Sequence, residues 1–222
     1  MVGVTAPYAG TPLPVVTLSV VGPGATRQVA GQVARRARSG DIVVLVGDLG
    51  AGKTTFAQGF ANALGVTEPV TSPTFTLVRE YPLDRPSGDD SPSSALATLF
   101  HADLYRLDTL GDVEDLGLAE RVEDGGVAVV EWGDLGAPVL GPGVLTVRLE
   151  AGDEPDERVV VLEDGAGRWR DRWDDLVGSL APWDPVVAVG SGRGVPTGGA
   201  PTVPDKLTSP SKQEAPSKQE AR

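Results

Sequence analysis

One segment constrains this chain more than any other: an apolar run that ends in a glycine-rich turn followed by Lys-Thr-Thr. The run spans residues 42–46, and the turn has the spacing G-x-x-x-x-G-K-T. In this motif, backbone N–H groups surround a phosphate, and the N-terminus of the following helix, predicted over residues 53–64, favours the same anion. We therefore predict a nucleotide phosphate site formed by Gly47, Asp48, Leu49, Gly50, Ala51, Gly52, Lys53, Thr54 and Thr55.

The order of the predicted elements indicates an α/β fold, a P-loop NTPase-like single domain in which helices flank a mixed sheet. Two of the strands, in the second half of 70–81 and at 95–102, are joined without a helix, which predicts an antiparallel hairpin. The other predicted strands are 15–20, 42–46, 126–130, 144–149 and 159–162, and the predicted helices are 25–37, 53–64, 109–122 and 169–180.

Composition divides the chain into a domain and two flanking segments. Residues 1–14 are rich in Gly and Pro and are expected to be flexible, and residues 15–184 form the predicted P-loop ATPase domain. Within that domain, Pro- and Ser-rich residues 82–94 suggest a mobile insertion. Residues 185–222 are of low complexity, with Pro-Ser-Lys-Gln-Glu-Ala twice near the end, and are predicted to be a disordered tail.

Charge and cysteine content exclude several classes of function. The chain has 222 residues, no cysteine and a formal net charge of −12. Disulfides and thiol catalysis are therefore excluded, and a generic nucleic-acid-binding surface is disfavoured. The absence of a long apolar run, or of a basic segment before apolar residues at the start, argues against a membrane span and a signal peptide. A cytoplasmic location is the simplest expectation.

Two carboxylates are candidates for a magnesium site beside the loop. Asp103 and Glu131 each end a predicted strand, and the carboxyl ends of such strands form the edge where ligands bind. Mg²⁺ takes hard oxygen ligands, so we assign Thr54, Glu131 and Asp103 to the metal and Lys53, Glu131 and Asp103 to catalysis. The alternative for either acid is that it only terminates its strand.

Residues after the predicted helix 53–64 could respond to the terminal phosphate of the nucleotide. Thr71, Ser72 and Thr74 occupy the position of a switch segment, although Ser and Thr around a proline also simply form turns. Arg79 and Arg106 could stabilise phosphate charge or pair with surface acids.

Two further side chains flank the candidate acids. Trp132 follows Glu131 and is expected to be a packing residue or a lid over the site, in contact with the bound nucleotide. His101 lies two residues before Asp103 on the same face of its strand, but a lone histidine is more often structural.

Two absences favour ATP over GTP. Asn62 is the only asparagine, and Lys53 is the only lysine before residue 206. An Asn/Thr-Lys-x-Asp reader of guanine therefore cannot be assembled.

Four motifs together resemble the TsaE (YjeE) family. They are the loop at 47–55, Ser-Pro-Thr-Phe-Thr-Leu-Val-Arg-Glu-Tyr at 72–81, His-Ala-Asp-Leu-Tyr-Arg-Leu at 101–107 and Val-Glu-Trp at 130–132. The resemblance covers about residues 15–180.

The resemblance implies a function that composition does not show. TsaE proteins are ATPases required for the threonylcarbamoyl modification of the tRNA adenosine next to the anticodon. They work with TsaD and TsaB, so the expected partners are homologues of these two proteins, with tRNA contacted only indirectly and no membrane involved. The expected cofactors are ATP and Mg²⁺. Two alternatives stay open: a small-molecule kinase, and a non-catalytic nucleotide-sensing module.

Overall fold

The computed structural model describes residues 13–83, 92–134, 136–141 and 143–190. The compact unit that contains them ends at Gly192. Most of the predicted flexible N-terminus, the centre of the predicted insertion and the chain after Gly190 lie outside the described residues.

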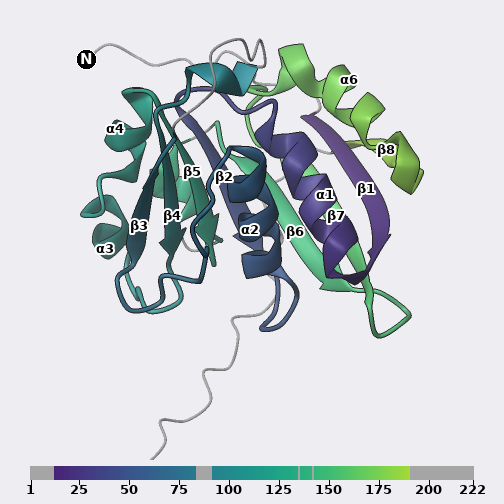
Figure 1. The fold of residues 1–222 in the computed structure, drawn as a ribbon, viewed down its shortest axis with the longest axis horizontal. Coiled ribbons are helices and arrows are strands. Elements are labelled where there is room, and N and C mark those ends of the chain that lie inside the picture. Colours follow the sequence, from purple (N-terminus) through teal and green to yellow (C-terminus); the bar gives the residue numbers. More distant parts are fainter. Residues whose placement is uncertain (1–12, 84–91, 135, 142, 191–222) are drawn as a thin grey trace, which may run out of the picture. The chain divides into compact units, whose positions relative to one another are not determined.

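Within the described residues, one eight-stranded mixed sheet has the order β3-β4-β5-β2-β6-β7-β1-β8 (Figure 1). Strands β4, β5, β2 and β6 run parallel, while β3 and β7 are antiparallel to their neighbours. The bounds are β1 Leu13–Val21, β2 Asp41–Val46, β3 Val78–Pro82, β4 Thr98–Asp103, β5 Gly126–Glu131, β6 Leu145–Ala151, β7 Glu157–Asp164 and β8 Val186–Gly190. This arrangement confirms the predicted mixed α/β fold and the predicted β3–β4 hairpin.

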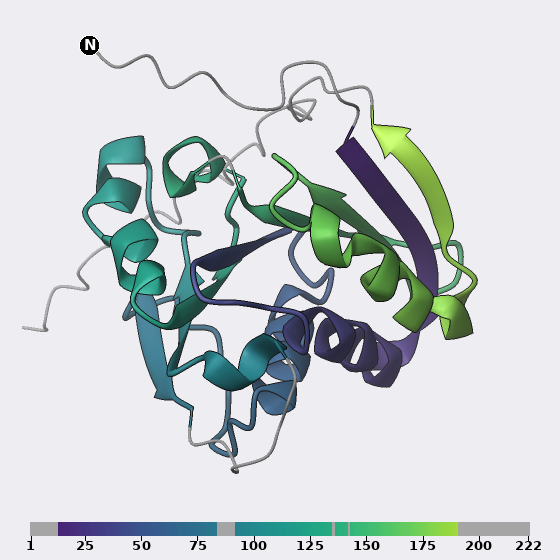
Figure 2. The same ribbon diagram turned by 90° about the horizontal axis from the view of Figure 1, so that it is seen from above.

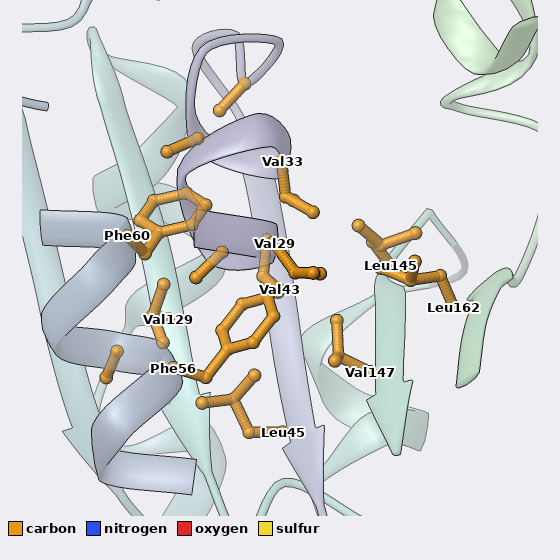
Figure 3. Packing of buried hydrophobic residues seen from close by; sticks show 14 of the residues in the cluster. Val29, Val33, Val43, Leu45, Phe56, Phe60, Val129, Leu145, Val147 and Leu162 are labelled. Carbon is orange, nitrogen blue, oxygen red and sulfur yellow. The ribbon is translucent and has the colours of Figure 1, made fainter. Parts of the chain in front are cut away.

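The helices divide between the two faces of the sheet. On one face, α2 packs Phe56 and Phe60 against β2 and β5, where they meet Val43, Leu45 and Val129 (Figure 3). Because β2 and β5 are buried on both faces, residues 42–46 and 127–130 read as continuous apolar runs. The helix bounds are α1 Gly22–Ala34, α2 Lys53–Ala63, α3 Leu110–Glu114, α4 Leu118–Glu123, α5 Ala137–Leu140 and α6 Arg170–Ser179.

The opposite face is covered by shorter helices. Val113 of α3, Leu118 of α4 and Leu140 of α5 form a second core with Val44 and Val130, which point away from α2. The predicted continuous helix over 109–122 is wrong, because Gly117 takes a left-handed conformation (φ 59°) that separates α3 from α4. This break allows each short helix to place an apolar residue on the sheet.

Two strand boundaries also differ from prediction. The predicted strand at 95–102 starts only at Thr98, because Pro92–Ala95 forms a 3₁₀ turn. The prediction that the whole of 185–222 is a tail is wrong for Val186–Gly190, since this segment pairs with the free edge of β1 as β8 (Figure 2). Averaging composition over the Gly- and Pro-rich end concealed a short segment in which three of the five residues are valine, a residue favoured in strands.

Candidate functional site

The predicted phosphate-binding loop and both candidate acids lie at one edge of the sheet. Glu131 ends β5 beside Leu45 of β2, and Asp103 ends β4 directly beside Glu131. The loop then leaves β2 and enters α2 at Lys53. Parallel strands bring these sequence-distant residues together because their carboxyl ends share an edge.

Glycine is a steric requirement at the first position of the loop. Gly47 has a φ of 145°, and a Cβ there would lie 2.2 Å from the carbonyl oxygen of Leu149 in β6. On the same side, Arg158 of β7 donates from Nε to the carbonyl oxygen of Ala51 at 3.2 Å. The β6–β7 hairpin therefore braces the loop from outside, while Leu49 at its tip is 87% exposed.

Lys53 is buried within the loop. Its Nζ donates to the carbonyl oxygens of Gly47 at 2.6 Å and Asp48 at 2.8 Å, and lies 3.5 Å from the ring centroid of Trp132. Burial lowers the pKa of Lys53, while the negative charge of Glu131 and three nearby aspartates opposes this shift. The one cation of the loop is thus held among carbonyls, an aromatic ring and carboxylates.

Glu131 connects Thr54 to His101. The Thr54 hydroxyl donates to Oε2 of Glu131 at 2.8 Å, and Nε2 of His101 lies 2.9 Å from Oε1. Glu131 and His101 are 2% and 1% exposed. The structure therefore brings together Thr54 and Glu131, both assigned to the metal, and adds a histidine for which sequence reasoning favoured a structural role. The alternation that places His101 and Asp103 on one face of the strand was the signal available in the sequence.

Asp103 accepts hydrogen bonds from hydroxyl groups of the predicted switch segment. Ser72 and Thr74 both donate to its Oδ2, at 2.8 Å for Thr74, and the two hydroxyl oxygens lie 2.7 Å apart. The backbone N–H of Tyr105 donates to Oδ1 at 3.0 Å. Asp103 is therefore coupled to the segment expected to respond to phosphate.

Trp132 lies over the lysine in a conformation that few non-glycine residues adopt. Its φ is 57°, and its ring centroid is 5.0 Å from that of Tyr105. Such backbone strain persists only where surrounding contacts hold it, and it concentrates at functional sites. The expected lid residue thus contacts the loop lysine directly.

The remaining candidates have surface partners. Arg79 donates to the Thr71 hydroxyl at 3.3 Å and pairs with Glu68 at 3.9 Å. Arg106 lies over the exposed ring of Phe75, 4.5 Å from its centroid. The structure does not bring Thr71, Arg79 or Arg106 into the Lys53–Glu131–Asp103 cluster.

The donor set fits a phosphate-bound magnesium ion better than an ion held by protein alone. Among the described residues, no group of three or more His, Asp or Glu side chains is placed to hold a metal. Thr54, Glu131 and Asp103 supply hard oxygen atoms, and Mg²⁺ characteristically combines few protein oxygens with phosphate and water.

None of the helices in the described part of the chain has the length and apolar character needed to cross a membrane.

Comparisons with known proteins show which family the chain is similar to. The family model for "Threonylcarbamoyl adenosine biosynthesis protein TsaE" matches residues 21–160. The chain is 38% identical over 157 residues to "tRNA threonylcarbamoyladenosine biosynthesis protein TsaE" of Bacillus subtilis, an alignment covering 70% of this chain and 90% of that protein. The protein of the same name from Streptomyces coelicolor is 41% identical over 147 residues, which cover 64% of this chain and 93% of the relative.

A solved structure gives the same result for the fold. The crystal structure of Bacillus subtilis YdiB superposes with a TM-score of 0.58 at 34% identity, covering 75% of this chain and 96% of YdiB. The matched family model spans the loop, Asp103 and Glu131, which are the residues that meet at the sheet edge. This chain belongs to the TsaE family of threonylcarbamoyl adenosine biosynthesis proteins.

Proposed function

We propose that this protein binds ATP with Mg²⁺ and hydrolyses it slowly as an accessory protein in the threonylcarbamoyl modification of tRNA. One observation carries the proposal: two adjacent residues of the predicted phosphate-binding loop make the contacts that this function needs. Lys53 donates to the carbonyl oxygen of Gly47, and Thr54 donates to Glu131. The names of the relatives place them in tRNA threonylcarbamoyladenosine biosynthesis. Site and family together support a P-loop ATPase acting in that pathway.

The residues of the site divide the work of phosphoryl transfer between them. Bound Mg²⁺ would neutralise charge on the phosphate oxygens, with Thr54, Glu131 and Asp103 as the protein groups that hold it. Lys53 supplies the positive charge of the loop, and the backbone N–H groups at residues 47–55 bind the phosphates. Glu131 orients the attacking water, and Trp132 excludes bulk water from the site.

The nucleotide is ATP in this proposal because the chain has no guanine reader of the Asn/Thr-Lys-x-Asp type. Its only asparagine, Asn62, belongs to α2, and Lys53 is the only lysine before residue 206. A protein that recognises guanine through this motif needs its Asn or Thr and its Lys at positions outside the phosphate-binding loop.

The partners in this proposal are homologues of TsaD and TsaB, in the cytoplasm. A formal net charge of −12 suits contact with proteins better than contact with a polyanion, so tRNA is reached only through the complex. The carboxylate-rich surface would repel the tRNA backbone.

The test is the rate of ATP hydrolysis by the purified protein, alone and with TsaD and TsaB. Stimulation by the pair is expected, with Lys53→Ala inactive in both conditions. Transfer of phosphate to a metabolite would instead establish the kinase alternative. ATP binding without turnover, even with both partners present, would leave a nucleotide-sensing module.

A further inference from the structure

We propose that His101 is a positioning residue for Glu131, selecting which carboxylate oxygen is available to the metal. The proposal deepens the ATPase function above and rests on it. Nothing in the chain's loop motif requires a histidine on β4, and the contact arises only from the pairing of β4 with β5.

The two oxygens of Glu131 have different partners. Oε1 meets Nε2 of His101 at 2.9 Å, and Oε2 accepts the Thr54 hydroxyl at 2.8 Å. Thr54 follows Lys53 at the start of α2, so Oε2 is the oxygen on the loop side. Because an ionised carboxylate only accepts hydrogen bonds, the imidazole donates from Nε2 and restricts rotation of the carboxylate. His101 thereby leaves Oε2 to Thr54 and the metal.

Strand register produces this contact. His101 is paired with Val129 and Asp103 with Glu131, so His101 and Glu131 are diagonal neighbours on β4 and β5. Alternate residues of a strand share a face, which places both side chains on the side of the sheet that α2 covers. The backbone thus brings the imidazole to Glu131 without a loop.

Burial argues against a role in packing alone. The His101 side chain is 1% exposed, and its Nδ1 has no hydrogen-bond partner among the described residues. A buried polar atom without a partner is unfavourable, so an apolar side chain of similar size would pack at lower cost. The bond from Nε2 to Glu131 is the polar interaction that the structure gives this ring. Residues that orient metal ligands commonly carry such a bond.

The first experiment observes the contact without nucleotide. His101 is the only histidine of the chain, so labelling the full-length protein with [¹⁵N]histidine gives one imidazole to observe by NMR. We expect an Nε2–H signal protected from exchange with water. Glu131→Ala should shift it strongly and remove the protection, whereas Thr54→Ala, which removes the other partner of Glu131, should leave it protected. An Nε2–H that is unchanged in Glu131→Ala overturns the proposal.

The second experiment measures the metal dependence that positioning predicts. His101→Leu should raise the Mg²⁺ concentration needed for half-maximal ATPase activity by roughly 10- to 100-fold, the usual effect of losing a partner of a metal ligand. Its affinity for ATP measured without Mg²⁺ should stay near that of wild type. His101→Gln keeps an N–H donor and should restore most of the Mg²⁺ response.

Leu99→Ala is the matched control. Leu99 lies on the same face of β4, is 1% exposed and belongs to the apolar core, so this variant reports the effect of disturbed packing alone. The proposal is overturned if His101→Leu has the same Mg²⁺ requirement as Leu99→Ala, or if His101→Gln is as impaired as His101→Leu. Failure of the wild-type protein to bind ATP would instead overturn the proposed function, and the NMR experiment would still report on the contact.

Discussion

Asp103 and Glu131 occupy paired positions at the ends of two parallel strands, and hydroxyl groups from different segments donate to each carboxylate. Glu131 accepts from Thr54 of the loop, and Asp103 accepts from Ser72 and Thr74 of the following segment. The two acids therefore bind different parts of the chain: Glu131 the loop, and Asp103 the segment that follows α2.

Replacing the loop lysine should remove activity. Lys53→Ala deletes the cation that lies among two loop carbonyls and Trp132, and we expect ATP turnover to fall by about 100-fold or more, as when a charge-stabilising donor is lost. ATP binding and steady-state hydrolysis measure this, with circular dichroism to confirm folding. Unchanged turnover would contradict the phosphate-loop assignment.

Replacing Glu131 and replacing Asp103 should have different effects on ATP hydrolysis. Glu131→Ala is expected to retain most nucleotide affinity and lose hydrolysis, because Thr54 and the attacking water lose the group that orients them. Binding of a fluorescent ATP analogue and single-turnover hydrolysis distinguish the two steps. Asp103→Ala is the companion variant: if it loses hydrolysis while Glu131→Ala keeps the wild-type rate, the orienting role belongs to Asp103.

The first glycine of the loop should not tolerate a side chain. Gly47→Ala places a methyl group 2.2 Å from the Leu149 carbonyl oxygen at a φ of 145°, so the loop must move away from β6. We expect weaker ATP binding and a lower thermal midpoint. Gly178→Ala in α6 is the control, because nothing lies within 4 Å of its added Cβ and a helix interior favours alanine. Equal behaviour of the two variants would contradict this account.

The C-terminal boundary of the domain can be tested by truncation. A chain ending at Pro185 loses β8 and exposes the edge of β1, and a loss of about 2 kcal/mol would lower the thermal midpoint by roughly 4–8 °C for a domain of this size. A chain ending at Gly192 keeps the compact unit and should match the full-length protein in midpoint and ATPase rate. Thermal unfolding measures both, and equal midpoints for the two truncations would show that β8 adds no stability.

The sequence alone determined the local features of this protein. The turn between β2 and α2 was predictable because glycines and a lysine at these spacings, within residues 47–55, are the pattern of a phosphate-binding turn. Strands β2 and β5 were predictable because burial on both faces requires continuous apolar runs. Asp103 and Glu131 could be proposed because each ends such a strand.

Only the tertiary structure decided which of these residues meet. His101 and Glu131 are 30 positions apart, and Thr54 and Glu131 are 77 apart, so strand order and register had to be known before either contact could be seen. The pairing of β8 with β1 likewise depends on an edge that β1 leaves free after pairing with β7. Local patterns specify what each segment can form, whereas contacts across the sheet depend on the energy of the whole packed arrangement.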